Sequence, residues 1–172
     1  MQLRDNGLRF SPITIFLHWL VAVLLFSIIG LSIARSTGLA GEDAAALEHL
    51  QNLFGTGLFV ISIYRFWARM TSWHPLPVGT PNPIEVIVSR SVAAALALAM
   101  MLLPIAVWLS RSAAGQVISL PGGFFIPTLI EPNAAVKAVV DVLFNIGATA
   151  FLAGLALHIF GACKNHFILK NA

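Results

Sequence analysis

Two histidines lie inside long apolar segments of this 172-residue sequence, where an imidazole is the side chain best able to do chemistry. His18 lies six residues after Pro12, and His158 lies six residues before Lys164. At 1.5 Å per residue, each ring should lie about 9 Å from the end of its helix. Ionisable side chains are costly in lipid, so the few that occur there are usually functional. If the first and last helices are neighbours, both imidazoles can face one cavity at the same depth.

Two imidazoles from facing helices are a common ligand set for the iron of haem b. We predict that His18 and His158 are its axial ligands, because two nitrogen ligands keep the iron six-coordinate and favour electron transfer. The haem propionates should point to the same membrane face. Three basic residues are predicted to meet them there: Arg9, Arg65 and Arg69. In the alternative interpretation, each histidine only hydrogen-bonds a neighbouring helix.

The composition indicates that these segments lie in lipid. Of the residues, 58% are hydrophobic and 10% are charged, whereas a soluble domain carries about a quarter charged residues. No basic run suggests binding to nucleic acid. Cys163 is the only cysteine, so an internal disulfide is excluded, and no Cys-X-X-Cys-His motif offers covalent haem attachment.

We predict an all-α integral membrane protein, a four-helix bundle that forms one domain over residues 1–172. The expected spans cover about residues 11–34, 50–66, 88–109 and 134–163, each near the roughly 20 apolar residues that cross a bilayer. The first segment does not resemble a cleaved signal peptide, so we expect it to stay in the mature protein. The proline-rich residues 74–83 should separate the second and third spans. The apolar residues 121–133 should lie in the membrane interface or fold over the bundle.

Basic residues are unevenly distributed between the two faces of this four-span arrangement. Seven fall on the face that carries both termini: Arg4, Arg9, Arg65, Arg69, Arg90, Lys164 and Lys170. Three fall on the other face, Arg35, Arg111 and Lys137, together with the acids Glu42, Asp43, Glu48, Glu131 and Asp141. Positive charge favours the cytoplasmic side. Both termini are therefore expected in the cytoplasm, with the protein in a bacterial inner membrane.

Three segments resemble the bacterial cytochrome b561 family: PITIFLHWL around His18, YRFWAR at the end of the second span, and LHIFGACKNHF near the C-terminus. The resemblance implies a four-helix membrane protein with two haems that moves electrons between a quinone and a partner. Some family members oxidise superoxide and pass its electron to ubiquinone. His18 and His158 match the family's ligands of the cytoplasmic-side haem.

The sequence departs from the family at the second haem. Gln51 stands where the second helix should supply a histidine, and Asp141 or Val142 stands at the fourth-helix position. We therefore expect one haem. A second haem would need His49, alone or with one of three unusual partners: Met100, Met101 or Asn145.

The resulting prediction is a membrane-bound b-type cytochrome that transfers electrons between its haem and a quinol, with ubiquinone as a candidate, or a partner protein. The alternative is an accessory subunit of a larger respiratory or photosynthetic complex, with a structural or vestigial haem site. Whether the protein is an enzyme of the quinone-linked or superoxide-oxidising type stays open. Acidic residues on the non-cytoplasmic face disfavour superoxide as a substrate.

Overall fold

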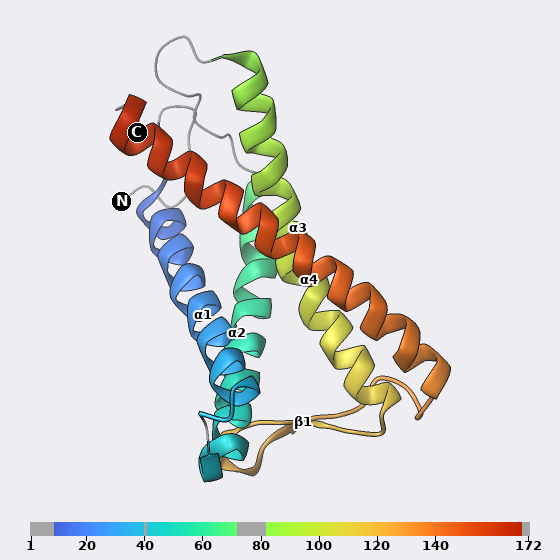
Figure 1. Cartoon of the computed structure of the whole chain (residues 1–172). Coiled ribbons are helices and arrows are strands. Elements are labelled where there is room, and N and C mark those ends of the chain that lie inside the picture. The colour runs from blue at the N-terminus through green and yellow to red at the C-terminus, as the bar shows by residue number, and fades with distance from the viewer. Residues whose placement is uncertain (1–8, 40, 72–81, 170–172) are drawn as a thin grey trace.

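The structure, a computed structural model, describes residues 9–39, 41–71 and 82–169. Four α-helices account for most of these residues (Figure 1): α1 (Pro12–Ser36), α2 (Ala44–Thr71), α3 (Pro83–Ala113) and α4 (Ala134–Cys163). A short 3₁₀ turn, η1 (Gly41–Asp43), precedes α2, and a π-helical stretch, η3 (Lys164–Leu169), continues α4. The predicted all-α bundle is confirmed.

Capping residues explain where three of the helices begin. Ser11 precedes α1 and its Oγ accepts a hydrogen bond from the Thr14 amide at 3.2 Å. The side-chain oxygens of Asn82 and Asn133 cap α3 and α4 in the same way. Asn82 followed by Pro83 starts α3 five residues before the predicted span. Pro83 therefore belongs to a helix and not to the predicted loop, whose residues 74–81 lie outside the described residues.

The helices pack as two pairs, α1 with α2 and α3 with α4, and α2 and α3 join the pairs. Figure 1 shows α4 crossing α3 obliquely. Glycines on α4 face leucines of α3 at this crossing: an added Cβ at Gly147 would lie 3.3 Å from Leu103, and one at Gly154 would lie 3.4 Å from Leu96. Small residues allow helices in lipid to approach closely, so these glycines leave room for the leucines of α3 at the crossing.

The composition of α2 differs from that of the other helices. Among the described residues, α1, α3 and α4 are long and apolar enough to cross a membrane, and α2 is not one of them. With 28 residues, α2 reaches about 42 Å and is long enough. Its mean hydropathy is lowered by polar side chains such as Gln51, Asn52 and Arg65, which bond to other parts of the protein.

We call the end where α1 begins and α4 ends the histidine end, and the opposite end the strap end. The strap is the segment 114–133, which contains a small antiparallel hairpin of β1 (Ile118–Ser119) and β2 (Phe125–Ile126) joined by the turn η2 (Pro121–Gly123). It reaches from the ends of α3 and α4 to α2 (Figure 1). Asn52 of α2 donates to the Ser119 carbonyl at 2.9 Å. The segment thus folds over the bundle, which is one of its two predicted positions.

Candidate functional site

The structure brings His18 and His158 together at the histidine end. His18 is in the second turn of α1 and His158 is near the end of α4. Their ring centres are 6.1 Å apart, and the ring planes are inclined by 70°. The two residues are separated by most of the chain, and they meet because each lies a similar distance from the same end of the bundle.

This separation fits two imidazoles that share one metal centre. A bond from a metal to an imidazole nitrogen is about 2 Å long, as at zinc. The ring centre lies about 1 Å beyond the nitrogen, so two rings on opposite sides of one metal have centres about 6 Å apart. The distance between the His18 and His158 rings therefore suits bis-histidine ligation of iron.

Arg65 of α2 contacts His18 of this pair. Its Nη1 donates to the Leu17 carbonyl at 3.3 Å, and its Nη2 lies 3.4 Å from Nδ1 of His18. The other two predicted propionate partners lie at the same end, Arg69 in the last turn of α2 and Arg9 just before α1. A cationic rim beside the histidines suits the carboxylates of a haem.

The helix surfaces near the two histidines carry small and apolar residues. Gly161 lies one turn further along α4, on the side of the histidine, and a Cβ built there would meet nothing within 4 Å. Along α1 and α4 the exposed side chains near the pair are apolar, including Ile15, Leu157 and Phe160. A flat apolar macrocycle could pack against such surfaces with little loss of hydration.

The residues considered for a second haem lie on α2, α3 and α4. In the part of the chain that the structure describes, no hydrogen bond or ring contact joins His49 to another side chain. Gln51 accepts a hydrogen bond from Arg35 at 3.0 Å. Asn145 lies on α4, where its backbone carbonyl accepts a hydrogen bond from the Thr149 hydroxyl at 2.8 Å.

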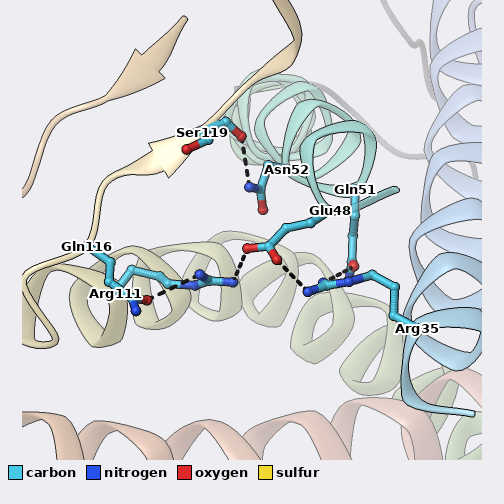
Figure 2. Close-up of polar contacts among 7 residues, drawn as sticks. All are labelled: Arg35, Glu48, Gln51, Asn52, Arg111, Gln116 and Ser119. Atoms are coloured by element: carbon cyan, nitrogen blue, oxygen red, sulfur yellow. Dashed lines mark hydrogen bonds and ion pairs between the residues drawn. The ribbon is translucent and has the colours of Figure 1, made fainter. Parts of the chain in front are cut away.

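Sequence reasoning missed a polar cluster at the strap end. Glu48 bridges two arginines, with contacts of 2.5 Å to Arg35 and 2.6 Å to Arg111 (Figure 2). Its position in the sequence predicts only that Glu48 is one of the acids of the non-cytoplasmic face. A usable signal was present, since Arg35 and Arg111 are two of the three basic residues that depart from the positive-inside pattern. A cation beside the apolar layer is costly unless it is paired, so each arginine can be expected to have a carboxylate partner.

Facing histidines at one end of a bundle of apolar helices define a helical membrane protein with a site suited to a bis-histidine metal centre. The chain belongs to the prokaryotic cytochrome b561 family, whose family model matches residues 9–172. Cytochrome b561 homolog 2 of Escherichia coli (strain K12) is 26% identical to it over 173 residues, covering 99% of this chain and 92% of that protein. The resemblance inferred from the three motifs is confirmed. The chain is thus a multi-pass bacterial membrane protein of a family of b-type cytochromes that act in electron transfer.

Proposed function

We propose that this protein carries electrons through a single haem b held between His18 and His158, and exchanges them with a quinol such as ubiquinol or with a redox partner protein. The observation that supports this most strongly is the 6.1 Å separation of the two ring centres. When bound, the haem supplies a one-electron couple that no side chain here offers.

The side chains around the pair have distinct tasks in this proposal. His18 and His158 hold the iron from α1 and α4, and Arg65 is close enough to His18 to meet a propionate. Arg69 and Arg9 extend the cationic rim at the same end. A guanidinium binds a carboxylate in a bidentate manner, so these residues would fix the orientation of the macrocycle.

We further propose that the histidine end faces the cytoplasm from a bacterial inner membrane. The three basic residues of the strap end, Arg35, Arg111 and Lys137, each pair with a carboxylate. At the histidine end, Arg69 and Arg90 have no carboxylate partner among the described residues. Uncompensated positive charge therefore collects at the histidine end, which is the distribution that retains an end in the cytoplasm.

The haem assignment is tested by the reduced-minus-oxidised spectrum of the purified full-length protein. The wild type should show a b-type spectrum with one haem per chain by pyridine haemochrome. His18→Ala and His158→Ala should each abolish the spectrum, because removing either imidazole breaks the six-coordinate set. His49→Ala and His166→Ala are matched controls that should retain it. An unchanged spectrum in both His18→Ala and His158→Ala would refute the assignment.

A second candidate function is that of an accessory subunit in a larger membrane complex. It is favoured by the strap, on which Phe124 is 72% and Phe125 is 61% exposed. Adjacent exposed aromatic residues are typical of surfaces that contact a partner or the membrane interface. Co-purification with a larger complex in mild detergent, without electron transfer by the isolated chain, would support this function over the first.

A further inference from the structure

Two ion-paired clusters connect all four helices at the strap end. The first contains Arg35 of α1, Glu48 of α2 and Arg111 of α3. The second contains Asp141 and Lys137 of α4 together with Ser110 of α3. Since Arg111 and Ser110 are adjacent in α3, the two clusters meet at the last turns of that helix.

The first cluster is bonded on several sides. Its three side chains are about one-third exposed. Arg35 also donates to Gln51, and Arg111 also donates to Gln116 of the strap at 3.3 Å (Figure 2). Its placement follows from the helix dipoles, because Arg35 and Arg111 lie in the last turns of α1 and α3, where positive charge is favoured. Glu48 lies near the start of α2, where negative charge is favoured.

The second cluster holds α4 against α3. Asp141 pairs with Lys137 one turn earlier on α4. Its other carboxylate oxygen accepts a hydrogen bond from the Ser110 hydroxyl at 2.5 Å. Both oxygens of Asp141 therefore have donors, and Lys137, the third basic residue of this end, is neutralised.

These contacts do not fit a haem at the strap end. The family resemblance implies one histidine at the position of Gln51 and another at that of Asp141 or Val142. Here Gln51 is bonded to Arg35, and Asp141 is bonded to Lys137 and Ser110. A carboxylate held by a cation and a hydroxyl is a poor substitute for a haem imidazole. The residues that would have to turn toward an iron are instead the ones that connect the helices.

We infer that the Arg35–Glu48–Arg111 and Lys137–Asp141–Ser110 clusters replace a second haem site and hold the four helices together where that cofactor would otherwise do so. The inference deepens the proposed function, since it leaves the site at His18 and His158 as the one redox centre. Arg35 lies 17 residues beyond His18 along α1, or about 26 Å. Changes in the clusters are therefore expected to alter stability and to leave the spectrum of the histidine site unchanged.

The test compares melting temperature and haem stoichiometry in purified full-length variants. Glu48→Gln leaves two arginines without their carboxylate, so the melting temperature should fall by about 2–4 °C for each kcal/mol of stability lost. Asp141→Asn should lower it by a smaller amount in the same direction. Both variants should keep the wild-type haem count of one per chain and the wild-type spectrum. Glu85→Gln is the matched control. Glu85 is exposed, and among the described residues its one ion pair is with Lys164 at the other end, so the melting temperature should change little.

A double variant separates a specific cross-link from a general loss of folding. If Glu48 and Arg111 act on each other, Glu48→Gln combined with Arg111→Gln should lower the melting temperature by less than the sum of the single changes. Additive losses would refute the cross-link. Two haems per chain in the wild type, or a Glu48→Gln variant that loses haem without losing stability, would refute the replacement. A wild-type chain without any haem would refute the proposed function instead, while the melting temperatures would still test the clusters.

Discussion

The guanidinium of Arg65 lies 3.4 Å from Nδ1 of His18 and also holds the carbonyl of the preceding residue, Leu17, at 3.3 Å. Arginine only donates hydrogen bonds, so Nδ1 of His18 must be the acceptor and carries no proton in this contact. A neutral His18 ring therefore has its proton on Nε2. An iron ligand also needs a bare nitrogen. If Nδ1 binds iron, its lone pair is used, and if Nε2 binds iron, Nδ1 carries the proton. In both cases Arg65 must leave His18, which frees its guanidinium for a propionate.

Arg65 should therefore influence the midpoint potential of the haem more than a cation at the same end that does not contact the histidine site. Arg65→Gln removes a positive charge near the propionates, which makes the oxidised iron relatively more stable. We expect the midpoint potential to fall by about 60 mV, a tenfold change in the equilibrium constant for one electron. Arg65→Lys should keep most of the wild-type value, and Arg90→Gln, at an exposed position of the same end, serves as the control. A redox titration in which Arg65→Gln keeps the wild-type potential would separate Arg65 from the propionates.

Ser112 should stabilise the strap. Its side chain is fully buried, and its Oγ donates to the Trp108 carbonyl and accepts from the Leu129 amide at 2.9 Å. Ser112→Ala leaves that strap amide without its partner, which should cost about 1–3 kcal/mol of unfolding free energy. Ser36→Ala, at an exposed position, is the control. Two measurements are made on each variant: its thermal unfolding, and the rate at which a protease cleaves the strap in the folded protein. Equal stability and equal strap cleavage in both variants would contradict this role.

Ser62 presents the opposite case. It is 2% exposed, and among the described residues its Oγ has no hydrogen-bond partner. A buried hydroxyl without a partner costs free energy that an alanine avoids. We expect Ser62→Ala to leave the unfolding free energy unchanged or to raise it by about 1 kcal/mol. Thermal unfolding of Ser62→Ala beside Ser112→Ala gives the comparison, and a clear loss in Ser62→Ala would mean that the hydroxyl has a partner.

The single cysteine offers a direct test of orientation. Cys163 is exposed and lies at the end of α4, at the histidine end. If this end faces the cytoplasm, a membrane-impermeant maleimide should label Cys163 in inverted vesicles and not in intact spheroplasts. In the matched variant Cys163→Ser with Leu39→Cys, the thiol moves to an 81% exposed position of the strap end. Its labelling should be reversed, and labelling of Cys163 from outside would overturn the proposed orientation.

The sequence alone predicted the positions of the helices along the chain and the distance of the two histidines from the helix ends. Apolar runs of sufficient length predict helices in lipid, because the backbone has no other way to satisfy its hydrogen bonds there. Caps such as Asn82 with Pro83 then adjust the ends by a few residues. Depth along a helix depends only on residue number, so His18 and His158 could be assigned to one level before any packing was known.

Only the tertiary structure decided which side chains meet. Glu48 contacts Arg35 and Arg111, which lie 13 and 63 residues away in the sequence, and nothing in a hydrophobic pattern selects those partners. Arg65 lies against His18 for the same reason, since the rotation of α2 about its axis depends on packing against α1. Residue spacing determines how far along a helix a group lies. The direction in which the group points depends on the contacts between helices, and those exist only after the chain has folded.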